Sequence, residues 1–144
     1  MLAPPIWGER RKVSKEILCV YLAGPITPTS RRNHSVEHLD NIRRGISMGK
    51  VLMENGFSVY NPFLDFSYLL EGSAEFLTVS RIRKMDLAWI PRSDAVFLLP
   101  GWKRSVGARG EVEAAKKANV PCLESIDDLV AFRDKMREQK EEPK

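Results

Sequence analysis

Short, continuous apolar runs separated by longer amphipathic stretches are the feature that most constrains this fold. The two clearest runs cover residues 17–23 and 95–99, and both are rich in residues that favour β-strands. Uninterrupted apolar runs of this length are typical of strands buried on both faces, as in parallel sheets. Two weaker runs, at 57–60 and 120–123, complete a set of four predicted strands.

Helical patterns lie between and after these strands. The predicted helices cover, in chain order, residues 39–53, about 74–90, about 107–119 and from 125 onward, and 63–75 is predicted to be a loop. In the first helix, apolar or small residues recur at three- and four-residue spacing, as expected for one apolar face: Leu39, Ile42, Ile46, Gly49 and Met53. Asn55-Gly56 is a good helix stop.

The alternation of strands and helices predicts an α/β fold of the flavodoxin or Rossmann-like type. This fold is a three-layer sandwich, in which helices cover both faces of a parallel sheet of four to five strands. Because crossover connections are right-handed, few strand orders are possible, and we expect the order 2-1-3-4. Ligands of such sheets bind at the carboxyl ends of the strands where the order reverses, which here means the loops after Ala23 and Leu99.

Length and composition fit one ordinary domain. We expect it to span residues 16–134, with a flexible N-terminal arm at 1–15 and a charged C-terminal tail at 135–144. The net charge is +4, but basic and acidic residues are interleaved, so we expect no nucleic-acid polymer as a partner. The apolar runs are too short to span a bilayer, so we expect no membrane partner. Cys19 and Cys122 lie in apolar runs, which predicts reduced core thiols and a cytoplasmic location.

The loop after the third predicted strand carries the first chemical signal. Gly101, Gly107 and Gly110 allow the backbone to approach a ligand closely, and Ser105 stands where a helix N-cap is expected. The free amide groups at such a helix start, together with its dipole, favour an anion or a sugar hydroxyl. A plain capped helix after a tight turn explains this segment equally well.

Helix geometry separates two glutamates just after this loop. Glu111 lies on the alanine-rich face that is expected to pack on the sheet, whereas Glu113 shares a face with Lys116 and Lys117. Glutamate is rarely buried without a partner or a function. Glu111 is therefore the candidate functional carboxylate, and we expect Glu113 to be a surface residue.

Asp86 shows the same anomaly, because it falls on the core-facing side of the predicted helix over 74–90. An ion pair with Arg83 is the alternative explanation. Asp94 precedes the third strand at the opposite end of the sheet, and we interpret it as a turn residue.

The two histidines, His34 and His38, have no cysteine or carboxylate at metal-ligand spacing, so we expect no metal site and no cofactor. Neither lies near a serine or cysteine in a way that indicates a hydrolytic triad. Two carboxylates in one pocket instead suit displacement at an anomeric carbon.

Three motifs together carry a resemblance to a known family. They are Tyr21-Leu22-Ala23-Gly24-Pro25-Ile26, Asp86-Leu87 preceding Ser93-Asp94-Ala95-Val96, and Ser105-x-Gly107-x-x-x-Glu111. In these motifs the chain resembles the nucleoside 2-deoxyribosyltransferase superfamily, which includes 2′-deoxynucleoside 5′-monophosphate N-glycosidases. The resemblance covers about residues 17–124, the whole predicted core.

The resemblance implies catalytic roles for Glu111 and Asp86. Glu111 would attack C1′ of the sugar and form a glycosyl-enzyme intermediate. Asp86 would contact the base or sugar and assist protonation of the leaving group. Ser105 and the amide of Gly107 would hold the 5′-hydroxyl or 5′-phosphate.

The resemblance also implies a sugar site after the first strand, and the substrate-binding residues expected there are Tyr21, Gly24, Pro25 and Ile26. Water or a second base would then accept the sugar. Relatives form dimers or larger assemblies, so we expect a homo-oligomer.

Two further residues of the glycine-containing loop, Trp102 and Arg109, are candidates for substrate binding. Trp102 could stack on a base, or equally form a hydrophobic lid or a dimer contact. The first loop lacks the arginine of the Gly-Ser-Ile-Arg sequence typical of the nucleotide hydrolases, so Arg31, Arg32 or Arg109 is the candidate cation for a phosphate.

The expected function is cleavage of the N-glycosidic bond of a (deoxy)nucleoside or nucleoside 5′-monophosphate through Glu111. Two alternatives remain open. A phosphoribohydrolase with a Pro-Gly-Gly-x-Gly-Thr-x-x-Glu motif fits less well, because Trp102 replaces the second glycine and no threonine follows Gly107. A nucleotide-binding sensor or interaction module would keep the pocket without turnover.

Overall fold

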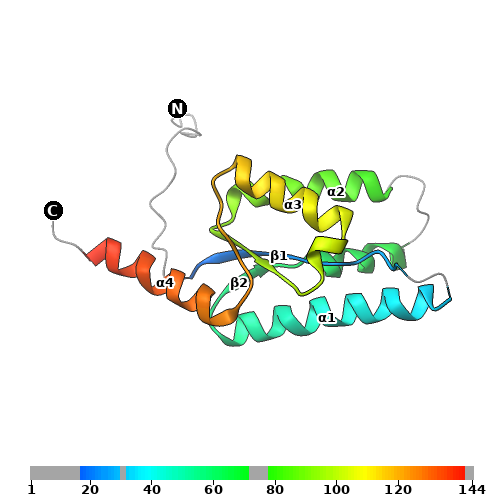
Figure 1. Ribbon diagram of the computed structural model, residues 1–144, viewed down its shortest axis with the longest axis horizontal. Helices are drawn as coiled ribbons and strands as arrows, with labels where there is room; N and C mark the ends of the chain where they lie inside the picture. The colour runs from blue at the N-terminus through cyan, green and yellow to red at the C-terminus, as the bar shows by residue number, and fades with distance from the viewer. Residues whose placement is uncertain (1–16, 30–31, 72–77, 142–144) are drawn as a thin grey trace, which may run out of the picture.

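The computed structural model describes residues 17–29, 32–71 and 78–141, and these form a three-layer α/β sandwich (Figure 1). Within them the sheet has four parallel strands in the order β2-β1-β3-β4: β1 (Cys19–Ala23), β2 (Ser58–Tyr60), β3 (Ala95–Leu98) and β4 (Cys122–Leu123). One face is covered by α1 (His34–Glu54) and α4 (Ile126–Glu141), and the other by α2 (Val79–Leu87) and α3 (Val106–Lys117). The predicted fold class and strand order are confirmed.

The side chains of the central strand β1 alternate between two hydrophobic cores. Val20 and Leu22 pack in the core on the α1 and α4 side, and Tyr21 and Ala23 pack in the core on the α2 and α3 side. The register pairs Ala23 with Leu98 at the end of β3. Both strands therefore end side by side, and the loops that follow them meet at one edge of the sheet.

The buried face of α1 differs from the predicted one. The helix buries Asn41, Gly45, Gly49 and Leu52, whereas three members of the predicted apolar face are exposed: Leu39, Ile46 and Met53. A Cβ on Gly45 would lie 2.1 Å from the Phe63 ring. A Cβ on Gly49 would lie 2.5 Å from Nδ2 of Asn61. The glycines face inward because the chain after β2 occupies the space beside them.

That chain segment corrects a second prediction. Residues from 63 onward were expected to form a loop, but Pro62–Glu71 form the 3₁₀ helix η1. Oδ1 of Asn61 accepts a hydrogen bond from the Phe63 amide at 3.0 Å and so caps the start of η1. Its Nδ2 donates to the Gly45 carbonyl at 3.2 Å. Asn61 therefore ties η1 to α1.

The helix α2 is shorter than the prediction of about 74–90. It ends at Leu87, because Pro91 has no N–H to donate to the Leu87 carbonyl and its ring cannot continue the helix. A short 3₁₀ turn, η2 (Ile90–Arg92), follows instead. Residues 72–77 lie outside the described part of the chain.

The ends of the chain and the cysteines give three further results. Helix α4 continues to Glu141, so the tail expected from Lys135 is helical that far, in line with the helix-favouring Lys, Glu, Arg and Gln residues in this stretch. The arm predicted at residues 1–15 lies outside the described residues. Cys19 is exposed rather than in the core, since it begins β1, and both Cys19 and Cys122 are free thiols.

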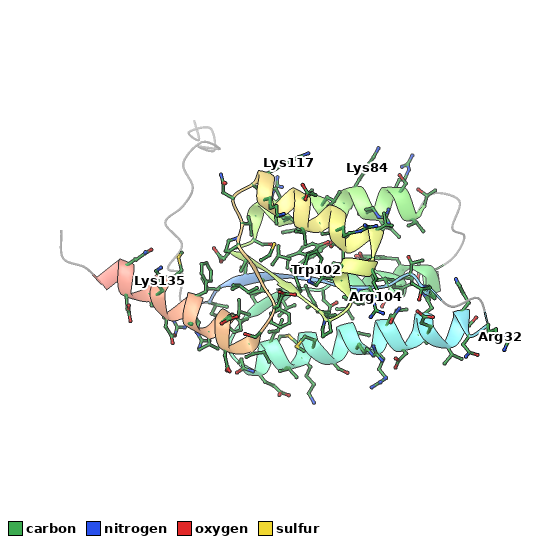
Figure 2. All side chains as sticks on the ribbon, in the orientation of Figure 1. Arg32, Lys84, Trp102, Arg104, Lys117 and Lys135 are labelled. Carbon is green, nitrogen blue, oxygen red and sulfur yellow. The ribbon has the colours of Figure 1, made fainter. Side chains whose placement is uncertain are left out.

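Basic side chains lie on several different elements of the fold (Figure 2). Figure 2 shows Arg32 just before α1, Lys84 on α2, Lys117 at the end of α3 and Lys135 on α4, so the labelled cations lie on different elements. In the described segments, no helix combines the length and the apolar character that crossing a membrane requires.

Candidate active site

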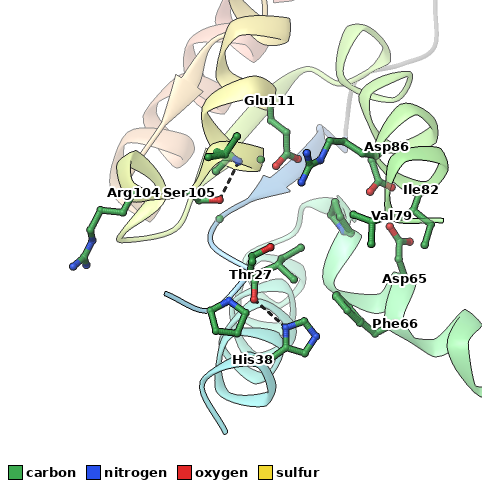
Figure 3. Close-up of a pocket in the computed structure, with 18 of the residues that line it drawn as sticks. Thr27, His38, Asp65, Phe66, Val79, Ile82, Asp86, Arg104, Ser105 and Glu111 are labelled. Atoms are coloured by element: carbon green, nitrogen blue, oxygen red, sulfur yellow. Dashed lines mark hydrogen bonds between the residues drawn. The ribbon is translucent and has the colours of Figure 1, made fainter. Parts of the chain in front are cut away.

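A cavity of about 740 Å³ opens where β1 and β3 end, on the α2 and α3 side of the sheet (Figure 3). Its wall consists of the end of β1 and its loop, His38 of α1, the first part of η1, one side of α2, and the start of α3 with Arg104 before it. A cavity of this size is typical of a small-molecule site. The two loops that the strand order indicated, after Ala23 and after Leu99, both reach this cavity.

Glu111 lies on the first turns of α3, and its carboxylate points into the cavity (Figure 3). The pKa of Glu111 is raised to about 7, mainly by burial and to a smaller extent by the charge of Asp86, while the Tyr21 hydroxyl and the charge of Arg83 lower it. Glu113, in contrast, is exposed and lies 3.8 Å from Lys116. The predicted division of these two glutamates between the inner and outer faces of α3 is confirmed.

Tyr21 lines the cavity beside Glu111. Its side chain is fully buried, and its ring stacks on Tyr60 with ring centroids 5.5 Å apart. The hydroxyl oxygen is buried without a hydrogen bond of normal geometry among the described residues. Burial and the neighbouring Glu111 carboxylate raise the pKa of Tyr21 far above its usual value. The phenol therefore stays protonated, and its proton is available to Glu111.

Asp86 reaches the cavity from α2 and is held by an aromatic hydroxyl. The Tyr60 hydroxyl donates to Oδ1 of Asp86 at 3.0 Å. Burial raises the pKa of Asp86, partly offset by this hydrogen bond and by Asp65. No ion pair joins Asp86 to Arg83 within the described ranges, so the alternative explanation of Asp86 is wrong.

Arg83 faces α3 instead. Its Nη2 lies 3.4 Å from the position that a Cβ on Gly107 would take, and its charge lowers the pKa of Glu111. Arg83 therefore brings a positive charge to the start of α3.

Asp65 is a cavity residue that the sequence interpretation missed. It lies on η1, and its carboxyl and that of Asp86 point toward one another (Figure 3). Burial, followed by the influence of Asp86 and Glu111, raises the pKa of Asp65 to about 8. The signal was present in the sequence, because Asp65 is a single carboxylate within the apolar run 62–70.

The start of α3 has the geometry that the sequence predicted. The Ser105 hydroxyl oxygen accepts a hydrogen bond from the Ala108 amide at 3.2 Å and caps the helix. The amides of Val106 and Gly107 have no acceptor within the helix. Since Ser105, Val106 and Gly107 all line the cavity, these amides and the Arg83 guanidinium are positioned near one region of its wall.

Side chains of α1 hold the loop after β1 in place. Asn41 donates to the Ile26 carbonyl at 3.2 Å, and Nδ1 of His38 lies 3.2 Å from the same oxygen. Gly24 is required by packing, because a Cβ there would lie 2.7 Å from Cβ of Leu99. Gly24 and Ile26 both line the cavity, as predicted.

Comparison with known protein families finds one that matches residues 18–124, and its description is "Domain of unknown function (DUF4406)". The chain belongs to this family. Comparison with curated proteins finds no match. The matched range of the DUF4406 domain contains every cavity-lining residue described above.

Three predicted binding residues of the DUF4406 domain do not line its cavity. Trp102 packs against the core on the α3 side, and its Nε1 donates to Glu124 at 2.8 Å, which holds the indole away from the cavity. Pro25 approaches Gly101, where a Cβ would lie 3.6 Å from its ring. Arg109 is exposed on α3.

Of the other two expected cations, Arg31 and Arg32, only Arg32 is described, and it does not line the cavity. Arg31 lies outside the described residues, and Arg32 is exposed before α1. Arg104 borders the cavity, but its guanidinium points away from it (Figure 3). In the described part of the DUF4406 domain, no group of three or more His, Cys, Asp or Glu side chains could hold a metal ion.

Proposed function

We propose that this chain cleaves the N-glycosidic bond of a nucleoside or nucleoside 5′-monophosphate, with Glu111 as the nucleophile. The observation that carries the proposal is the Glu111 carboxylate, which points, beside the second carboxylate Asp86, into a cavity large enough to hold a nucleoside. With a pKa of about 7, a substantial fraction of Glu111 is ionised near neutral pH. Two carboxyl groups on one cavity suit a displacement in two steps at an anomeric carbon.

The first step forms a covalent intermediate. The Glu111 carboxylate attacks C1′, a bond forms between C1′ and the carboxylate oxygen, and the bond between C1′ and the base nitrogen breaks. The electron pair of that bond goes to the base, which takes a proton from the Asp86 side of the cavity. In the second step water, or a second base, attacks C1′ and restores the carboxylate.

The start of α3 is our proposed site for the 5′ group of the substrate. The Ser105 hydroxyl and the Gly107 amide would donate to a 5′-hydroxyl or a 5′-phosphate. Arg83 would supply the positive charge that the first loop lacks, because its guanidinium lies against Gly107. Tyr21 would face the sugar and donate to Glu111. The cytoplasm, where cysteines stay reduced, is the location we propose for this activity.

The experiment that tests the proposal measures release of free base. The purified protein is incubated with a panel of nucleosides and their 5′-monophosphates, with and without acceptor bases, and products are separated by chromatography. We expect base release from at least one substrate, and a covalent glycosyl adduct on Glu111 detected by mass spectrometry of the trapped enzyme.

Glu111→Gln should lower the rate by at least about 10³-fold, because it removes the nucleophile. Glu113→Gln is the matched control, two residues away on the exposed face of the same helix, and should leave the rate unchanged. Base release that survives Glu111→Gln would contradict the mechanism. Tight nucleotide binding by calorimetry, without base release over hours, would identify a binding module instead.

A further inference from the structure

The Asp65 carboxyl contains a buried oxygen that has no hydrogen-bond donor in the described part of the chain. Oδ2 of Asp65 is inaccessible to solvent and accepts no hydrogen bond from the described residues. The neighbour of the Asp65 carboxyl is a second acid, the carboxyl of Asp86 (Figure 3). Two ionised carboxylates cannot bond to each other, because both only accept hydrogen bonds. A buried acceptor without a donor is costly. One proton on this pair turns the unpartnered oxygen into a donor to Asp86.

The surroundings of the pair favour one shared proton over two or none. The apolar side chains of Phe66 and Ile82, both half-buried, line the same part of the cavity and weaken solvation of a second negative charge. Tyr60, on β2, donates to Asp86 and stabilises one ionised carboxylate. The pair is therefore expected to hold one proton and one negative charge.

Other titratable or charged groups around the pair come from every neighbouring element. Glu111 of α3 adds negative charge, and Arg83 of α2 adds positive charge but forms no ion pair with Asp86. His38 of α1 is held by the Ile26 carbonyl and packs edge-on against Phe66 at 4.8 Å. Tyr68 of η1 raises the pKa of Tyr60. The Tyr21 hydroxyl, on β1, lowers the pKa of Glu111.

We propose that Asp65 and Asp86 share a single proton, and that this pair rather than Asp86 alone supplies the proton to the departing base. The inference rests on the proposed function. Asp65 is a positioning residue in this scheme, because it acts through Asp86 by keeping a proton on the pair. Burial and Asp86 raise the pKa of Asp65 to about 8, consistent with a proton that stays in place at neutral pH.

The proton balance closes over the full cycle. When Glu111 bonds to C1′ and the bond to the base breaks, the base nitrogen takes the shared proton, and the pair becomes a dianion. Water then attacks C1′ and one of its protons returns to the pair, while the bond from C1′ to Glu111 breaks and the carboxylate is restored. No further reactant is needed.

The test compares pH profiles of kcat/KM for base release. The wild-type profile should rise near pH 7 as Glu111 ionises and fall above about pH 8 as the pair loses its proton. Asp65→Asn removes the second carboxyl, so the falling limb should move to lower pH, with a loss of about 10²-fold at pH 8. Tyr60→Phe removes a donor to ionised Asp86, so the limb should move to higher pH.

A substrate with a different leaving group shows whether Asp65→Asn loses activity because it no longer supplies a proton or because the site is distorted. In an N7-methylated purine nucleoside the purine ring already carries a positive charge. The base therefore leaves as a neutral molecule and needs no proton. Asp65→Asn should therefore cleave this substrate at close to the wild-type rate, whereas Glu111→Gln should cleave neither substrate. Ser67→Ala, on the exposed side of η1, is the control and should match the wild type on both.

The outcomes separate the two proposals. If Glu111 is required but Asp65→Asn keeps the wild-type profile, or loses activity equally on both substrates, the shared proton is wrong and the N-glycosidase proposal stands. If no substrate releases base, the function fails, and carboxyl-carbon NMR of labelled aspartate then tests the pair directly. Titration of the two carboxyls in two steps, with one lost in Asp65→Asn, supports the pair, and a single ordinary low pKa for both overturns it.

Discussion

The two faces of the sheet differ in how closely the side chains pack on them. On the α1 and α4 side, the contact between α1 and η1 is tightly packed, and the Phe63 ring lies where a Cβ on Gly45 would be. On the α2 and α3 side, three carboxyl groups surround an open cavity: Asp65, Asp86 and Glu111. The first face contributes stability through close packing. The second face sacrifices stability, because buried acids and unfilled volume are both unfavourable for folding.

This difference predicts that substitutions on the two faces change stability in opposite directions. Adding volume on the packed face should destabilise the fold, and removing charge on the cavity face should stabilise it. Residues held for chemistry at a cost in stability are typical of functional sites.

The largest expected effect is on the packed face. Gly45→Ala places a Cβ 2.1 Å from the Phe63 ring, and the ring is fixed because Phe63 is almost fully buried. We expect a loss of about 3 kcal/mol in the free energy of unfolding, larger than the gain in helix propensity. Urea denaturation measures it.

A second substitution checks that the clash is the cause. Phe63→Leu removes part of the ring, so the double variant with Gly45→Ala should recover part of the loss rather than add to it. Additive losses would show that the contact between Gly45 and Phe63 does not limit the packing of this face.

The next effect has the opposite sign and depends on pH. Folding raises the pKa of Glu111 from 4.5 to about 7. Between these values the folded chain binds more protons than the unfolded chain, so the wild type loses stability as pH rises through this window. Glu111→Gln has no such proton to lose. At about pH 8 it should be more stable than the wild type by about 1–3 kcal/mol, reduced by the partial solvent access of this side chain.

The same variant should have close to wild-type stability at about pH 4, where Glu111 is protonated in both states. Thermal unfolding at the two pH values measures the difference. A variant that is less stable than the wild type at pH 8 would show that the Glu111 charge is stabilised by its surroundings, and the contrast between the two faces would fail.

The sheet was predictable because its signals are strong and local. The apolar runs of β1 and β3 are short and rich in strand-favouring residues, as is typical of buried strands, and right-handed crossovers leave few strand orders. The inner face of α1 was not predictable in this way, since Asn41, Gly45 and Gly49 do not look like core residues. They face inward because of contacts with η1, and those contacts appear only in three dimensions.

The site residues also fall into those that a local sequence pattern predicts and those that only the three-dimensional structure places. Glu111 and Asp86 were predicted because each is a carboxylate on the apolar side of a helix. Asp65 was missed because the segment around it was assigned to a loop, where a carboxylate is ordinary. Trp102 was expected near a ligand from its place on a loop, but its hydrogen bond to Glu124 holds the side chain elsewhere. A loop position alone does not determine where a side chain points.

The smallest effect tests a glycine that the sequence linked to ligand approach. Gly110 is an exposed residue within α3, and a Cβ there would meet nothing within 4 Å. Gly110→Ala should therefore stabilise the chain by about 0.5–1 kcal/mol, because alanine loses less backbone entropy in a helix. Base release should not change, since Gly110 does not line the cavity. Loss of activity in a stabilised variant would instead mean that substrate, or a partner, contacts the outer face of α3.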